Sequence, residues 1–201
     1  KKFLPRGTKI GHAGTLDPFA TGVLLLLIGP ATKRCESLMD LPKQYQATVR
    51  FGATTETDDL NSPAQAVAGA VMPTADSITS ALTHFVGTVM QRPPAYSALK
   101  VAGRRAYDLA RKGQTVELPP RPIRIDRIEL LRYEPPDAFI LVDCGRGTYI
   151  RAIARDLGEQ LACGGYLTQL CRTKIDSFTV AQAMRLELLS EQNLWQHLLP
   201  L

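Results

Sequence analysis

The chain has 201 residues, of which 45% are hydrophobic and 21% charged, a globular composition that excludes disordered, collagen-like and coiled-coil proteins. Its longest unbroken apolar run, residues 23–28, is far shorter than the roughly 20 residues that cross a bilayer. No apolar region follows the basic N-terminus, so we expect no secretory signal and a cytoplasmic protein.

Hydrophobic periodicity, taken in chain order, predicts a mixture of helices and strands. We expect a helix over 31–39, a strand over 45–51, a helix over 76–85 after the capping residue Thr74, and a short helix over 104–112. A strand over 123–130 contains a phase slip typical of a bulge, a third strand covers 139–144, and helices cover 149–161 and 186–199. This order predicts an α+β fold with a mixed, mainly antiparallel sheet and flanking helices.

Four cysteines, at positions 35, 144, 163 and 171, lie far apart. No two have the spacing of a zinc site, so we predict reduced core thiols and no metal centre. A disulfide between Cys163 and Cys171 is the alternative, which an intracellular location disfavours.

Basic charge is concentrated in one segment. Residues 92–127 carry nine basic and three acidic residues, whereas the rest of the chain is about neutral. Prolines at both ends of residues 91–122 indicate an inserted excursion from the sheet. Such a segment suits a partner with a phosphate backbone, and the plain alternative is a solvated basic face with no partner.

The loop over residues 11–22, GHAGTLDPFATG, is the most unusual stretch. Its three glycines permit tight turns and close approach of a ligand, and Pro18 holds Asp17 in an extended conformation. Asp17 is therefore either a functional carboxylate or a turn residue that accepts backbone N–H bonds. His12 could bind a ligand, wedge against bases or cap a turn.

A second stretch, CGRGTYIR at 144–151, leads into a predicted helix. Arginine in a first helical turn opposes the helix dipole, so we expect an anion, either a carboxylate or a phosphate, at Arg151. The alternative leaves Arg151 in solvent and pairs Arg155 with Glu159. Tyr45 and Tyr149 lie at element ends, where they either stack on a nucleobase or pack in the core.

Several motifs in a fixed order carry a family resemblance. Residues 11–33, GHAGTLDPFATGVLLLLIGPATK, closely resemble the catalytic motif of the TruB family of tRNA pseudouridine synthases. Further matches are KQY at 43–45, FG at 51–52 followed by Thr55, Thr57 and Asp59, YSALK at 96–100 and GTYIR at 147–151. The likeness covers nearly all of the chain from Gly11 to about Ile175.

The resemblance implies roles for particular residues. Asp17 corresponds to the catalytic aspartate, Arg151 to its arginine partner and Tyr45 to the tyrosine that stacks on the target base. The implied substrate-binding residues are His12, which fills the space left by the flipped nucleotide, Tyr149 and Leu170, which line the uracil pocket, Asp59 and Lys33. Residues 91–122 resemble the family's thumb, and we expect contacts with the RNA backbone from Lys100, Arg104, Arg105, Arg111 and Lys112.

The implied reaction converts uridine 55 in the T-loop of tRNA to pseudouridine, without a metal or redox cofactor. The partner would be the T-arm stem-loop, with no obligate protein partner and no membrane. A base inside a stacked loop must be flipped out to react, and the residues present offer one carboxylate kept ionised by a guanidinium. Whether Asp17 attacks the sugar or acts otherwise stays open.

The chain also departs from the family pattern. Residues 1–10 lack the Lys-Pro-x-Gly-like motif of the family's first strand, and we expect no C-terminal PUA domain. We therefore expect residues 1–201 to form one catalytic domain with a missing first strand and an exposed sheet edge. The alternatives are a guide-RNA-dependent enzyme of the dyskerin type and a non-catalytic RNA-binding or RNA-folding module. A glycoside or nucleoside hydrolase built on Asp17 is disfavoured, because the usual kind needs two carboxylates flanking the bond and this loop offers one.

Overall fold

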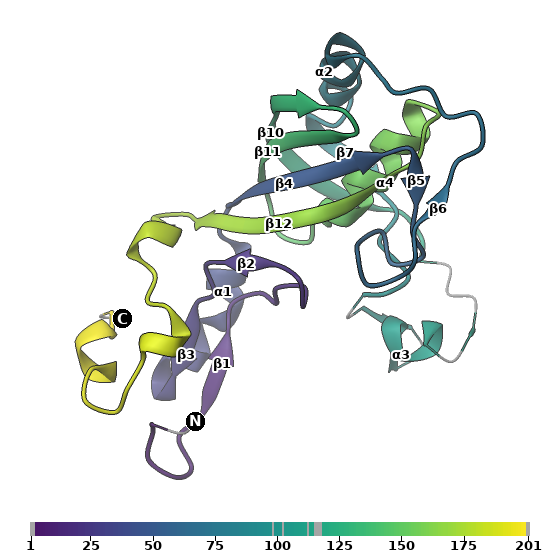
Figure 1. Cartoon of the computed structure of the whole chain (residues 1–201). Coiled ribbons are helices and arrows are strands. Elements are labelled where there is room, and N and C mark those ends of the chain that lie inside the picture. Colours follow the sequence, from purple (N-terminus) through teal and green to yellow (C-terminus); the bar gives the residue numbers. More distant parts are fainter. Residues whose placement is uncertain (1–2, 98, 102, 112, 115–117, 200–201) are drawn as a thin grey trace.

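The computed structural model describes residues 3–97, 99–101, 103–111, 113–114 and 118–199. Its main feature is a sheet of seven strands (Figure 1). The neighbours run in the order β13 (Phe178–Thr179), β12 (Gly165–Ile175), β4 (Lys43–Phe51), β11 (Asp137–Cys144), β10 (Arg121–Glu134) and β7 (Gly87–Gln91). These pairs are antiparallel, and β2 (Thr21–Gly22) pairs with β12 in parallel. The predicted α+β class is confirmed.

Helices α2 (Ala75–Thr83) and α4 (Ile150–Gln160) pack on the same face of this sheet (Figure 1). The alternation of β4 places Val49 and Phe51 in the core beneath them. Helix α2 begins as predicted, because the Thr74 hydroxyl accepts a hydrogen bond from the Ser77 N–H at 3.1 Å and so caps the helix. The core therefore lies between this sheet face and the two helices.

Short strand pairs surround the main sheet. Strands β1 (Ile10–His12) and β3 (Leu26–Ile28) enclose the glycine-rich loop, β5 (Ala53–Thr54) pairs with β6 (Gln65–Ala66), and β8 (Lys100–Val101) pairs with β9 (Arg104–Arg105). None of the helices formed by the described residues has the length and apolar character of a bilayer span. All four cysteines are free, so the alternative of a disulfide is wrong.

Three predicted helices differ from the structure. The helix predicted over 31–39 is a 3-10 helix, η1 (Gly29–Arg34), followed by the α-helix α1 (Cys35–Asp40). The helix predicted over 104–112 shortens to α3 (Ala106–Ala110), because residues 104–105 form strand β9 instead. Lys112 lies outside the described residues. The helix predicted over 186–199 is replaced by two 3-10 turns, η3 (Leu186–Leu188) and η4 (Leu194–His197). A further 3-10 turn, η2 (Val180–Gln182), precedes them.

Side-chain hydrogen bonds explain the loss of the third helix. The Asn193 side chain accepts from the Ser190 N–H at 2.8 Å and donates to the Leu188 carbonyl at 2.9 Å. Such local bonds compete with the helical pattern. Leu194 is buried, but Leu186 and Trp195 remain exposed, so little apolar burial compensates for that competition.

The two longest strands that were not predicted are β12 and β7. Strand β12, next to the centre of the sheet, has register shifts between Leu167 and Gln169 and between Arg172 and Lys174. Each bulge reverses the in–out alternation, so the period that identifies a strand is lost. Strand β7 has only five residues and is mostly exposed. The bulge predicted for the 123–130 strand is confirmed at Ile125 to Arg127 of β10, with a second at Leu130 to Arg132.

Candidate active site

Asp17 lies in the loop between β1 and β2, where its carbonyl accepts from the Ala20 N–H at 2.9 Å. Its carboxylate forms a two-point pair with Arg151: Nε to Oδ2 is 2.9 Å and Nη2 to Oδ1 is 3.0 Å. The Asp17 side chain is 30% exposed, whereas that of Arg151 is 5% exposed. The loop thus presents a carboxylate that is open to a ligand on one side and bound to a buried cation on the other.

Arg151 is held by more than one acceptor. It belongs to the first turn of α4, and its guanidinium donates to the carbonyls of Thr57 at 2.8 Å and Tyr96 at 3.0 Å. Asp59 lies behind it, with Oδ2 3.6 Å from Nη1. Because the guanidinium is a planar fork of donors, these acceptors fix the direction in which it meets Asp17. The anion expected at Arg151 is therefore a carboxylate, and the alternative of a solvated Arg151 is wrong.

Asp59 is almost fully buried and does not face solvent. Its carboxylate accepts from the Thr57 hydroxyl at 2.7 Å and from the Asn61 N–H at 2.8 Å. The sequence predicts a contact with substrate for Asp59, but the structure places it behind Arg151, where it contacts protein groups.

Tyr45 and Leu170 come together on neighbouring strands. Leu170 pairs with Ala47, two residue pairs along the strands from the pairing of Tyr45 with Arg172. Burial raises the pKa of the Tyr45 phenol, against the effect of the nearby Arg172 guanidinium, which lowers it. Leu170 is itself buried against the core. The tyrosine is therefore a neutral, partly buried ring beside an apolar side chain.

Arg172 is the site residue that the sequence reasoning missed. Its side chain, 1% exposed, donates through Nε to the Val23 carbonyl at 2.7 Å and through Nη2 to the Gly14 carbonyl at 3.2 Å. It lies on strand β12, which was not predicted, and nothing in the neighbouring sequence indicated that this arginine is buried. The available signal was its position two residues after Leu170, which the family resemblance assigns to the uracil pocket.

Gly22 makes the close approach of β2 to β12 possible. Its φ is +104°, and a Cβ there would lie 2.2 Å from the Arg172 carbonyl oxygen. We expect Gly22→Ala to destabilise the fold by about 3 kcal/mol or more, from backbone strain and this clash. The matched control is Gly29→Ala, at φ +59° with nothing within 4 Å of the added Cβ, which should cost about 1–2 kcal/mol. Urea unfolding measures both, and equal losses would contradict this packing.

Tyr149 precedes α4 and is anchored by Gln91. The Gln91 amide accepts from the Tyr149 N–H at 2.9 Å and donates to its carbonyl at 3.1 Å. The Arg121 guanidinium carbon lies 5.3 Å from the centre of the Tyr149 ring. His12, at the end of β1, and Lys33, in η1, are both exposed.

Arg155 does not pair with Glu159, so that alternative is wrong. It contacts Asp58 through Nη1 at 3.0 Å and Asp156 through Nη2 at 2.8 Å, whereas Glu159 contacts Arg92 at 3.6 Å. Its Nη2 also donates to the Arg92 carbonyl at 2.7 Å. Arg155 thus ties α4 to the start of the predicted insertion.

Asp58 gives folding a pH dependence. Burial raises its pKa to about 6, against the attraction of Arg155 and Arg151. The unfolded value is about 3.9, so the folded state holds this proton more tightly. The contribution of Asp58 to the unfolding free energy therefore falls as pH rises from about 4 to about 6, and is constant above that.

We expect Asp58→Asn to gain stability relative to the unmodified protein by up to about 3 kcal/mol across that pH window. Asparagine keeps an acceptor for Arg155 and tolerates the φ of +57° at this position. Urea unfolding at pH 4, 6 and 8 measures the difference, with the exposed Asp126→Asn as control. A difference that does not vary with pH would contradict the burial argument.

The segment 91–122 leaves and rejoins the sheet at one point. Gln91 ends β7 and is the register partner of Arg121, which begins β10. Within the segment, Arg104 and Arg111 are exposed, and the Arg111 guanidinium lies over the Tyr107 ring at 5.5 Å. Lys100 and Arg105 are register partners of the β8–β9 pair.

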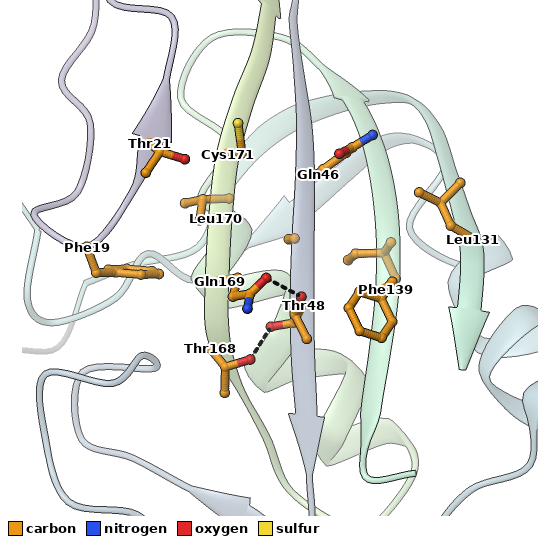
Figure 2. Close-up of a pocket in the computed structure, with 12 residues that line it drawn as sticks. Phe19, Thr21, Gln46, Thr48, Leu131, Phe139, Thr168, Gln169, Leu170 and Cys171 are labelled. Carbon is orange, nitrogen blue, oxygen red and sulfur yellow. Dashed lines mark hydrogen bonds between the residues drawn. The ribbon is translucent and has the colours of Figure 1, made fainter. Parts of the chain in front are cut away.

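A hollow of about 380 Å³ lies beside β12 and β4 (Figure 2). Phe19, two residues after Asp17, and Leu170 line this hollow. The Thr48 hydroxyl, also in its lining, donates a hydrogen bond to the Gln169 side-chain oxygen at 3.4 Å. Neither Asp17, Arg151 nor Tyr45 lines it, so it adjoins the candidate site without being that site. Among the residues that the structure describes, no group of His, Cys, Asp or Glu side chains could hold a metal ion.

Two family descriptions match the chain. Residues 1–150 match the N-terminal domain of TruB family pseudouridylate synthases, and residues 151–200 match the tRNA pseudouridylate synthase B C-terminal domain. The boundary between the two matches falls at the start of α4, although β12, beyond it, pairs with β4. The two matched regions therefore share one sheet.

Curated relatives agree with these matches. The chain is 49% identical over 176 residues to the tRNA pseudouridine synthase B of Bacteroides fragilis, covering 88% of this chain and 76% of that protein. It is 48% identical over 188 residues to the protein of that name from Mycobacterium ulcerans, covering 92% and 62%. A solved Cbf5-Nop10-Gar1 complex contains a chain with a TM-score of 0.64 and 27% identity, covering 89% of this chain and 44% of that one. With these matches and the Asp17–Arg151 pair in place, the chain belongs to the TruB family of tRNA pseudouridine synthases, isomerases that convert uridine to pseudouridine.

Proposed function

We propose that this chain isomerises uridine 55 in the T-loop of tRNA, with Asp17 as the catalytic residue and Arg151 as the partner that keeps its carboxylate ionised. The observation that carries the proposal is the two-point pair between these side chains, at 2.9 and 3.0 Å. The partly exposed carboxylate has a free side for a substrate. We place the protein in the cytoplasm, where its tRNA substrate is found.

The reaction conserves every atom of the nucleotide. The N1–C1′ bond breaks, the uracil turns while bound, and C5 joins C1′; C5 then loses a proton and N1 gains one. An ionised Asp17 serves this chemistry either as a nucleophile at C1′ or as a base, and both roles require the charge that Arg151 stabilises. A pocket that excludes water protects C1′ from hydrolysis, and buried Leu170 supports that exclusion.

The target base must leave its stack before it reacts, at a cost of a few kcal/mol. Stacking on Tyr45 is worth about 1–3 kcal/mol and offsets much of this cost. His12, exposed at the end of β1, would fill the place of the flipped nucleotide, while Tyr149 would line the uracil pocket. Lys33 is exposed and would meet the RNA backbone near the site.

We assign the segment 91–122 as the thumb that binds the RNA backbone. Its base is fastened to the site, because the Tyr96 carbonyl accepts from Arg151 and the Arg92 carbonyl accepts from Arg155. Arg104 and Arg111 are exposed on it. Lys100, Arg105 and Lys112 belong to the same basic segment and are assigned with them.

The thumb assignment predicts a salt effect. The double variant Arg104→Gln/Arg111→Gln should bind a T-arm stem-loop more weakly, and its slope of log affinity against log salt should be shallower by roughly 1 to 2. Fluorescence anisotropy over a salt series measures this slope. Arg132→Gln, which removes a half-exposed partner of Glu134 on β10, is the control and should leave it unchanged. An unchanged slope in the double variant would remove the thumb from RNA binding.

A guide-RNA-dependent enzyme fits less well, because relatives at 49% and 48% identity carry the name tRNA pseudouridine synthase B. A non-catalytic module would have no need of the Asp17–Arg151 pair. The test is conversion of a synthetic T-arm stem-loop by the chain alone, detected by carbodiimide labelling at unchanged RNA mass. Binding without conversion would support the non-catalytic module instead.

A further inference from the structure

Arg172 is a buried cation without a carboxylate partner among the described ion pairs. It is the largest fully buried side chain of the described residues, at 1% exposed. Burying an unpaired charge is costly, whereas an apolar side chain of similar size would avoid that cost. The fold must therefore supply other acceptors, and their identity indicates what this arginine does.

Those acceptors lie on the loop that carries Asp17. The guanidinium donates to the carbonyls of Gly14 at 3.2 Å and Thr15 at 3.4 Å, which precede Asp17, and to that of Val23 at 2.7 Å, which follows it. The backbone of Arg172 adds a further bond, from the Val23 N–H to its carbonyl at 2.8 Å. Arg172 thus forms hydrogen bonds with both ends of the loop that carries Asp17.

Tyr45 is the register partner of Arg172 on the neighbouring strand β4. Against the larger effect of burial, which raises the pKa of the Tyr45 phenol, the Arg172 guanidinium lowers it. Lys43 lies nearby, and its pKa is lowered, first by burial and then by Arg172. Arg172 is therefore bonded through its side chain to the loop of Asp17 and paired in register with the residue whose ring is assigned to the target base.

We propose that Arg172 is a positioning residue that fixes the distance between the Asp17 carboxylate and the Tyr45 ring, because its side chain bonds the loop while its backbone pairs with Tyr45 on β4. This inference rests on the proposed function. Only a planar fork reaches three carbonyls in fixed directions; a lysine ammonium keeps the charge but is a point donor. A displacement of about 1 Å at a reacting centre can lower the rate by about 10²-fold.

The test compares Arg172→Lys and Arg172→Met with the matched pair Arg50→Lys and Arg50→Met. Arg50 lies on β4 and pairs with Asp137 at 2.7 Å, outside the proposed catalytic machinery. For each variant, kcat and KM for a T-arm stem-loop are measured together with the dissociation constant and the melting temperature. We expect Arg172→Lys to remain folded, to bind RNA within about 3-fold of the unmodified protein, and to lose about 10²-fold in kcat. Arg172→Met should lose more, and both Arg50 variants should keep kcat within about 3-fold.

Several outcomes would overturn the inference. They are a kcat of Arg172→Lys near that of the unmodified protein, equal losses of kcat and RNA affinity, a loss of the same size in Arg50→Lys, and unfolding of both Arg172 variants, which would assign Arg172 to folding alone. Failure of the proposed function gives a different result, because the unmodified protein would then not convert the stem-loop at all.

Discussion

Asp17→Asn should lower the single-turnover rate of pseudouridine formation by at least about 10³-fold, the size of effect that general acid–base or nucleophilic groups contribute. The amide has the shape of the carboxylate but lacks the charge that meets Arg151 at 2.9 and 3.0 Å. Affinity for a T-arm stem-loop should change by less than about 5-fold, because the backbone contacts that dominate RNA affinity lie elsewhere. Carbodiimide labelling measures conversion, and anisotropy measures binding.

Asp126→Asn is the control for Asp17→Asn, since Asp126 is an exposed partner of Arg124 on β10. It should convert the stem-loop at the rate of the unmodified protein. Conversion by Asp17→Asn at that rate would remove Asp17 from the mechanism. A loss of binding as large as the loss of conversion would assign Asp17 to RNA binding instead.

Arg151→Ala should have the second largest effect, on both rate and stability. It leaves the buried Asp59 carboxylate without its neighbouring cation at 3.6 Å and the carbonyls of Thr57 and Tyr96 without donors. Breaking a buried charge pair by removing one partner costs about 3–5 kcal/mol, which urea unfolding measures. The rate should fall by at least about 10²-fold, because the ionised Asp17 loses its partner and its orientation.

Arg151→Lys separates the two effects. Lysine restores the positive charge but not the two-point contact, so we expect most of the stability to return while the rate stays at least about 10-fold low. Turnover should fall more than stem-loop affinity in both Arg151 variants. Equal losses of turnover and affinity would contradict the assignment of Arg151 as the partner of Asp17.

Local sequence signals predicted the elements whose pattern is regular. Strand β4 alternates without interruption across its core face, and the cap at Thr74 forms the bond expected of it. Strand β12 could not be predicted, because its two bulges reverse the alternation within eleven residues. The helix expected over 186–199 failed for the opposite reason: its pattern is helical, but most of its apolar side chains stay exposed, with Leu194 the buried exception.

The site was likewise predictable only in part from local sequence. An arginine in the first turn of a helix indicated an anion, and the structure supplies Asp17 from a loop more than a hundred residues earlier in the chain. Local sequence does not contain that pairing, and the family resemblance identified it. The place of Asp59 behind Arg151, and the grip of Arg172 on the loop, depend on strand register and bulges that no local pattern reveals.

The most direct test of the central claim is a crystal structure of the Asp17→Asn variant bound to a T-arm stem-loop, which this variant should hold without converting. We expect the target uridine out of its stack, its base on the Tyr45 ring and its C1′ about 3–4 Å from the residue 17 side chain. A target uridine still stacked in the loop, or one bound away from residues 17 and 151, would contradict the account.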